Sequence, residues 1–143
     1  MKMKLTGLSA IAVLFFSLNL SAQSPIGVWK SVDDNDGRAK SHIRIYEEGG
    51  KLFGKVIELL PAATITHCNK CSGEAKGKSL IDMIILRDLK ESDKKWEGGQ
   101  ILDPAKGKEY SCQISLSDSD TLKVRGYIGS PLFGRTQYWY RVN

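Results

Sequence analysis

Residues 110–128, YSCQISLSDSDTLKVRGYI, carry the pattern that decides the fold. From Tyr110 to Leu116, aromatic or apolar side chains take every second position, and serine or glutamine stands between them. After the polar residues 117–120, the alternation resumes at Leu122 and runs through Val124 and Gly126 to Ile128. A period of two places alternate side chains on opposite faces of a strand. The stretch therefore predicts a β-hairpin with one apolar face.

The same pattern extends over the chain after residue 25. We expect eight strands, at residues 26–32, 40–47, 52–60, 80–87, 95–102, 109–116, 121–128 and 135–142. Turn residues separate several of them, including Asp33–Gly37, Gly49-Gly50 and Asp103–Gly107. Short strands at regular spacing, with no amphipathic helix between them, indicate an antiparallel meander, and closing the meander removes its exposed edges. The predicted fold is all-β: a single antiparallel, eight-stranded, up-and-down barrel.

The first 22 residues differ from the rest of the chain. Lys2 and Lys4 precede an uncharged, mostly apolar stretch from Leu5 to Leu20, and small residues follow at Ser21-Ala22. This is the pattern of a secretory signal peptide (residues 1–22), with an apolar part too short to span a membrane. We expect cleavage after Ala22, which leaves 121 of the 143 residues and lowers the formal net charge from +5 to +3. Residues 23–143 would then form one soluble barrel domain in the periplasm or outside the cell.

Composition excludes several classes of protein. With 41% hydrophobic and 26% charged residues, the chain has the usage of a globular domain and not of a disordered tail. No second long uncharged stretch exists, so we expect no membrane span. A small positive charge without a dense Lys/Arg run argues against nucleic acid as a partner. The sequence leaves the oligomeric state open.

The three cysteines are candidates for a disulfide. Cys68 and Cys71 lie in residues 61–79, a long segment without periodicity, and Cys112 lies on the apolar face of its strand. In an exported protein the expected role is a structural disulfide. Either Cys68 pairs with Cys71 and Cys112 stays buried as a free thiol, or Cys112 ties the loop to the barrel. Both pairings stay open.

Metal and redox sites find weaker support in the same segment. A zinc site would need His67 and its neighbour Cys68 to reach one ion together with Cys71 and Cys112. A thioredoxin-like pair should open a helix beside a parallel strand, and haem attachment needs histidine where Ser72 stands. We therefore predict no metal and no cofactor.

No motif for catalysis is complete. Residues 73–79, GEAKGKS, have three residues between the glycines where a phosphate-binding loop needs four. Arg38 stands where a calcium loop starting at Asp33 needs glycine. There is no Gly-x-Ser-x-Gly elbow, and neither histidine has a partner recognisable from sequence. We name no catalytic residue, and the pattern favours a role other than that of an enzyme.

Aromatic and arginine positions predict how the barrel closes. Gly27-x-Trp29 opens the first strand, and Arg141 ends the last. The first and last strands of a closed barrel are neighbours, so an arginine can lie over the Trp29 indole in a cation–π contact. We predict that Trp29 and Arg141 close one end and leave the other end as a mouth.

Three stretches carry a resemblance to a known family: residues 25–30 (PIGVWK), residues 96–104 (WEGGQILDP), and residues 124–137, which include VRGYIG and LFGRTQ. Together with Tyr46, Gly54 and the Cys68/Cys71 pair, they resemble DUF2147, a family of small exported bacterial proteins of unknown function. The resemblance implies a lipocalin-like, calycin-type barrel, with Gly27-x-Trp29 as its opening motif. It also implies a packing arginine near the last strand, at Arg141 or Arg135. It implies no activity and no catalytic residue.

These observations favour an exported barrel that binds a small hydrophobic or amphipathic ligand. The prediction depends on whether Gly54, Gly98, Gly99 and Gly126 leave interior space or only permit strand bends. One alternative is an envelope interaction or stress-related module with a filled core, acting through exposed loops at residues 38–42 or 129–134. The second alternative is a redox or metal-dependent enzyme built on the Cys68/Cys71 loop.

Overall fold

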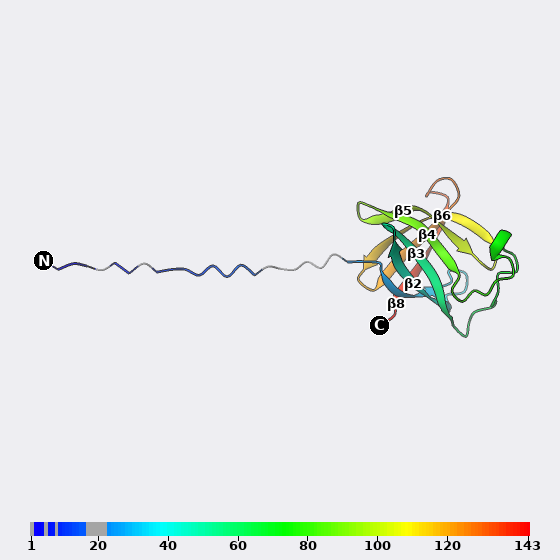
Figure 1. Cartoon of the computed structure of the whole chain (residues 1–143), viewed down its shortest axis with the longest axis horizontal. Helices are drawn as coiled ribbons and strands as arrows, with labels where there is room; N and C mark the ends of the chain where they lie inside the picture. Colours follow the sequence, from blue (N-terminus) through cyan, green and yellow to red (C-terminus); the bar gives the residue numbers. More distant parts are fainter. Residues whose placement is uncertain (1, 5, 8, 17–22) are drawn as a thin grey trace.

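The computed structural model describes residues 2–4, 6–7, 9–16 and 23–143. Its eight strands are β1 (Gly27–Val32), β2 (Ala39–Glu48), β3 (Lys51–Leu59), β4 (Ile84–Ser92), β5 (Lys95–Asp103), β6 (Lys108–Asp118), β7 (Thr121–Tyr127) and β8 (Gly134–Arg141). Neighbouring strands pair antiparallel in chain order and close into one barrel (Figure 1). A short 3₁₀ helix, η1 (Gly73–Ala75), interrupts the long loop between β3 and β4. The predicted fold class and topology are confirmed.

The structure describes only part of the segment before the barrel. The described residues up to Phe16 contain neither helix nor strand. The expected cleavage point after Ala22 lies outside the described residues. Among the residues that the structure covers, none forms a helix with the length and apolar character needed to cross a membrane.

The hairpin that decides the fold is formed by β6 and β7. Its pairs include Cys112 with Gly126, Ile114 with Val124, and Leu116 with Leu122, so the two apolar faces share one side of the sheet. That side is the barrel interior, where four of these residues are buried: Cys112, Ile114, Leu122 and Val124. The predicted end of the hairpin is wrong, because β7 ends at Tyr127 and the Ile128 side chain is 71% exposed.

Closure between β1 and β8 is short. The paired residues are Trp29 with Arg141 and Lys30 with Tyr140. The Val142 N–H also donates to the Val28 carbonyl at 2.9 Å, just beyond the strand end. Few backbone hydrogen bonds join β1 to β8. The side-chain contacts between these two strands, described below, are therefore important for closure of the barrel.

The fourth strand begins later than expected. We predicted residues 80–87, whereas β4 begins at Ile84 and continues to Ser92. Asp82 adopts a positive φ of 67°, and the Met83 N–H donates to the Leu80 carbonyl at 3.0 Å. This turn sends the apolar Leu80 away from the barrel wall and into a separate cluster with Cys68 and Cys71.

Candidate functional site

At one end of the barrel a tryptophan and an arginine are in contact. Trp29 is fully buried, and its Nε1–H donates to the Pro25 carbonyl at 2.8 Å. The Arg141 guanidinium carbon lies 4.3 Å from the centroid of the Trp29 ring. Arg141 also donates to the carbonyls of Ser24 and Ile26, at 2.8 and 3.2 Å. Arg141, and not Arg135, is therefore the arginine on Trp29, and the contact fixes the chain entering β1.

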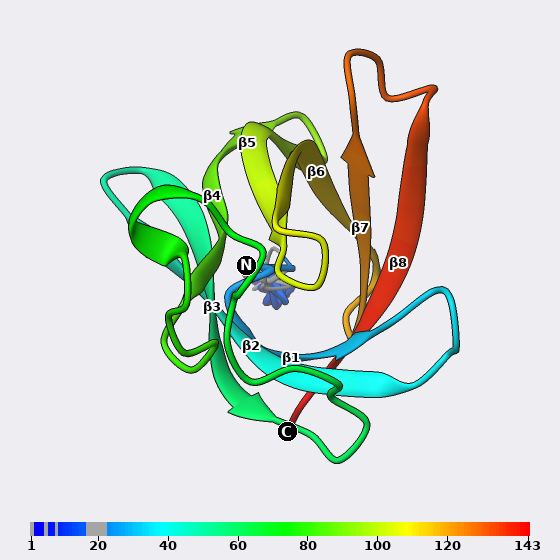
Figure 2. The same ribbon diagram turned by 90° about the vertical axis from the view of Figure 1, so that its right-hand side faces the viewer.

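The opposite end is open and leads into a cavity of about 420 Å³. Figure 2 views the barrel from this end, where the β1–β2 loop and the long β3–β4 loop (residues 60–83) lie. Loops from β1–β2, β3–β4, β5–β6 and β7–β8 all contribute lining residues. A cavity of this size lies in the range of small-molecule sites.

The inner wall of the cavity is apolar. Side chains from six strands, β3 to β8, contribute to it, among them Val56, Ile85, Ile101, Tyr110, Val124 and Trp139. Three of these, Val56, Val124 and Trp139, are almost fully buried. The Trp139 Nε1–H donates to the Gln137 Oε1 at 3.2 Å, so the one polar atom of the indole is satisfied. The wall suits the apolar part of a ligand.

The interior glycines divide into two groups. A Cβ at Gly99 would lie 2.1 Å from the Arg87 carbonyl oxygen, and a Cβ at Gly54 would lie 3.0 Å from Leu86, so both positions are filled by close packing. Gly98 has a φ of 80° at a register shift in β5 and accommodates a strand irregularity. Gly126 lines the cavity, and a Cβ there would meet nothing closer than Ile101 at 3.4 Å. Gly126 is therefore the glycine that leaves interior space.

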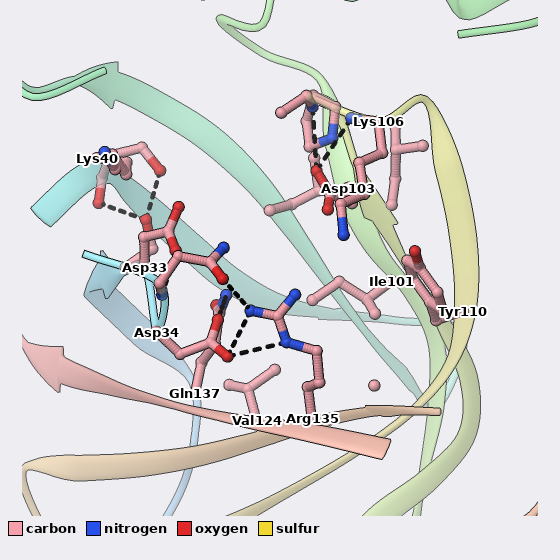
Figure 3. Close-up of a pocket in the computed structure, with 18 of the residues that line it drawn as sticks. Asp33, Asp34, Lys40, Ile101, Asp103, Lys106, Tyr110, Val124, Arg135 and Gln137 are labelled. Atoms are coloured by element: carbon pink, nitrogen blue, oxygen red, sulfur yellow. Dashed lines mark hydrogen bonds and ion pairs between the residues drawn. The ribbon is translucent and has the colours of Figure 1, made fainter. Parts of the chain in front are cut away.

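A polar network forms the rim of the cavity beside β8 (Figure 3). Arg135 donates from Nε and Nη2 to the Asp34 Oδ2, at 3.0 and 2.7 Å, and from Nη2 to the Asn35 Oδ1 at 2.8 Å. Gln137 donates to the other Asp34 oxygen at 3.1 Å. Burial raises the pKa of Asp34, but the hydrogen bonds from Gln137 and Arg135 and the arginine charge outweigh it, so the pKa is lowered. The network joins β8 to the β1–β2 loop.

The cysteines support another part of the rim. Cys68 and Cys71 form a disulfide, which is one of the two pairings left open by the sequence. The disulfide loop packs tightly on the β5–β6 turn, because a Cβ at Gly107 would lie 2.0 Å from the Lys70 carbonyl oxygen. The same turn supplies four cavity-lining residues, Asp103 to Lys106, and the β3–β4 loop supplies Ile65 and Leu80. The disulfide thus braces one wall of the mouth.

The ligands considered for zinc do not converge. Cys112 lies in the main barrel core, apart from the cluster of Cys68, Cys71 and Leu80, and His67 is exposed beside Thr66. Burial raises the pKa of the Cys112 thiol to about 12. A thiol held protonated in this way is a poor nucleophile, and Cys112 serves here as a packing residue.

Comparisons with known proteins place the chain in a family and show a structural neighbour. The family model for DUF2147, described as an uncharacterized protein conserved in bacteria, matches residues 27–141. The chain belongs to the DUF2147 family. Among solved structures, this DUF2147 barrel is similar to protein HP1028 from the human pathogen Helicobacter pylori, which is described as belonging to the lipocalin family. The TM-score is 0.74 with 16% identity over 84% of each chain, which shows a shared lipocalin-like fold. No curated protein matches.

Sequence reasoning missed most of the rim of this DUF2147 barrel. It considered Arg135 only as an alternative partner for Trp29, and it read Asp34 as part of a turn. A usable signal was present: Arg135, Gln137, Trp139 and Arg141 alternate along β8 and so share its inward face. What the sequence could not show is that the β1–β2 loop folds over the mouth and brings Asp34 to Arg135.

Proposed function

We propose that this protein is an exported barrel that binds one small amphipathic ligand through its open end. The cavity of about 420 Å³, apolar inside and polar at the rim, is the observation that carries the proposal. A pocket with a mostly apolar wall and a few placed polar groups is the usual form of a small-molecule site. The apolar part of the ligand would lie against Val124, Ile101 and Trp139, and its polar group would lie near Arg135 and Gln137.

Export is part of the same proposal. Residues 1–22 have the pattern of a signal peptide, and residues 23–143 would be the mature domain, acting in the periplasm or outside the cell. A disulfide between Cys68 and Cys71 suits an oxidising compartment. Because the disulfide braces the mouth, the compartment would also favour the shape of the binding site.

Native mass spectrometry of protein purified from its own host tests both parts. We expect a population heavier than the polypeptide by the mass of one small molecule, which is released on denaturation. The denatured chain should have the mass of a polypeptide that begins at Gln23. A protein that always arrives empty would contradict ligand binding, and a chain that retains residues 1–22 would contradict export by this route.

A second candidate function has an observation of its own. The β7–β8 loop exposes three large apolar side chains, Ile128, Leu132 and Phe133, at 71%, 83% and 77%. Arg125 holds this loop by donating to the Pro131 carbonyl at 2.7 Å. Exposed apolar clusters often mark interaction surfaces. Crosslinking in the native envelope tests an interaction role, with the double variant Leu132→Ser/Phe133→Ser as the matched control. Loss of a crosslinked partner in this variant would support the interaction role. An unchanged crosslinking pattern would contradict it.

A further inference from the structure

The charges around the mouth decide which kind of polar group the cavity accepts. Six side chains that are charged at neutral pH line the cavity, three acidic and three basic: Asp33, Asp34, Asp103, Lys40, Lys106 and Arg135. The formal charge of the lining is therefore balanced. A site balanced in this way has no surplus charge to attract a ligand of either sign.

Of the two lysines in the lining, one is already paired with an acidic side chain and the other is exposed. Lys40 binds Asp36 at 2.6 Å and donates to the Ala62 carbonyl at 3.2 Å. Lys106 is exposed, and its backbone N–H lies 3.3 Å from the Asp103 carboxylate. An exposed lysine of this kind adds little to binding. Arg135 is the basic residue that the close-up shows reaching across the mouth toward the β1–β2 loop (Figure 3).

One edge of the Arg135 guanidinium, the Nε–Nη2 edge, is committed to its neighbours. It gives two hydrogen bonds to one oxygen of Asp34 and a third to Asn35, while Gln137 occupies the other Asp34 oxygen. The hydrogen bonds and charge of Asp34 raise the pKa of Arg135, and the charges of Asp33 and Asp103 add to the effect. Asp33 and Asp103 line the same cavity as Arg135, so three carboxylates lie around it and one of them, Asp34, is bonded to Arg135.

A carboxylate ligand could pair with the Nε–Nη2 edge of Arg135 only by displacing Asp34. It would exchange one ion pair for another, and it would place a new negative charge beside Asp33, Asp34 and Asp103. Like charges placed together are a common way of rejecting a wrong ligand. A hydroxyl group can donate to a free carboxylate oxygen of Asp33 or Asp103, or accept from Arg135, without breaking the pair.

We propose that Asp34, by holding Arg135 in this ion pair, restricts the cavity to uncharged amphiphiles and excludes carboxylate ligands. The inference rests on the proposed ligand-binding function. It makes Asp34 a specificity-determining residue: with Asp34 neutralised, Arg135 becomes free and the cavity accepts anions.

Competition against a fluorescent neutral probe, N-phenyl-naphthylamine, tests this at pH 7. The competitors are decanol, decanoate and decylamine, which share a chain and differ in charge. In the wild type we expect decanol to compete at least about tenfold better than decanoate. In Asp34→Asn we expect decanoate to gain about tenfold while decanol stays within about twofold, and Asp34→Asn/Arg135→Gln should lose the gain.

The outcomes separate the two proposals. If the probe binds but the wild type accepts decanoate as well as decanol, or if Asp34→Asn leaves their ratio unchanged, the specificity inference is overturned and ligand binding stands. If neither probe nor competitor binds, both proposals are overturned. Should Asp34→Asn fail to fold, Arg135→Gln serves instead: it should weaken decanoate further and leave decanol unchanged, and equal effects on both would overturn the inference.

Discussion

Two arginines on the same face of β8, six positions apart, mark the two ends of the barrel and serve different purposes. Arg141 lies on the buried Trp29 ring and donates to three backbone carbonyls, those of Ser24, Ile26 and Ser119. Arg135 lies at the mouth and bonds only side chains, Asp34 and Asn35. Backbone partners fix the path of the chain, whereas side-chain partners can be exchanged for a ligand. The contacts assign stability to the end at Trp29, and the proposed function places ligand recognition at the open end.

The largest expected effect is a difference in stability between alanine substitutions at two isoleucines. Ile43 is fully buried beside Trp29 in the register of β1 and β2, whereas Ile101 is half-buried and faces the cavity. Ile43→Ala should lower the free energy of unfolding by about 2–5 kcal/mol because it leaves a void in a filled core. Ile101→Ala should cost clearly less, since it only enlarges an existing cavity. Urea unfolding of both variants measures the difference, and equal losses would break the division between the ends.

The two arginines give the next effect. Arg141→Gln removes hydrogen bonds to three backbone carbonyls and the contact with Trp29, so we expect a loss of about 1.5–3 kcal/mol. Arg135→Gln removes a rim ion pair whose arginine side chain is 49% exposed, and it should cost no more than about 1 kcal/mol. Thermal unfolding of the two variants side by side checks the order. A less stable Arg135→Gln would reverse the assignment of roles.

Alanine substitutions at two glycines, each of which adds one methyl group, compare the packing of the barrel wall at two positions. Gly99→Ala places a Cβ against the Arg87 backbone oxygen and should destabilise by about 1–3 kcal/mol as strands are forced apart. Gly126→Ala adds its Cβ on the cavity side at ordinary contact distance, and we expect stability within about 0.5 kcal/mol of the wild type. Denaturant midpoints measure both. A strongly destabilised Gly126→Ala would mean that the cavity wall is as tightly packed as the rest of the barrel.

The smallest effect is a pH dependence at the rim. The pKa of Asp34 is lowered in the folded protein, so its stabilising contribution is present above the ordinary carboxyl value of 3.8 and is lost as the pH falls through the lowered value. Because the rim is partly exposed, the contribution should be at most about 1 kcal/mol. Asp34→Asn should be less stable than the wild type at pH 7, and the gap should close in acid. A gap independent of pH would show that Asp34 does not act through its charge.

The sequence predicted the parts of the fold that follow from alternation. The β6–β7 hairpin, the barrel topology and the two-residue turn at Gly49-Gly50, where both residues have positive φ, came from local patterns. The start of β4 could not be predicted in this way, because Ile84, Ile85 and Leu86 are all apolar and show no alternation. The turn at Asp82 that rotates Leu80 out of the wall depends on packing against the disulfide, which no local pattern contains.

The cavity and its rim were harder to predict for a related reason. The cavity depends on Gly126, and nothing local separates it from Gly99, which is closed by the Arg87 backbone. The rim depends on a contact between Asp34 and Arg135, about one hundred residues apart in the chain. Such a contact is fixed by the closure of the barrel and by the loop over its mouth, and alternation within one strand carries no information about it.

Binding of N-phenyl-naphthylamine to the wild type and to Gly126→Phe tests the central claim most directly. A phenylalanine at this strand position projects into the cavity and fills the space that a ligand would use, and Gly126→Ala provides the matched control. The account predicts one saturable site in the wild type and in Gly126→Ala, and loss of binding in a folded Gly126→Phe. Equal binding by all three proteins would show that the cavity is not the site and would contradict the account.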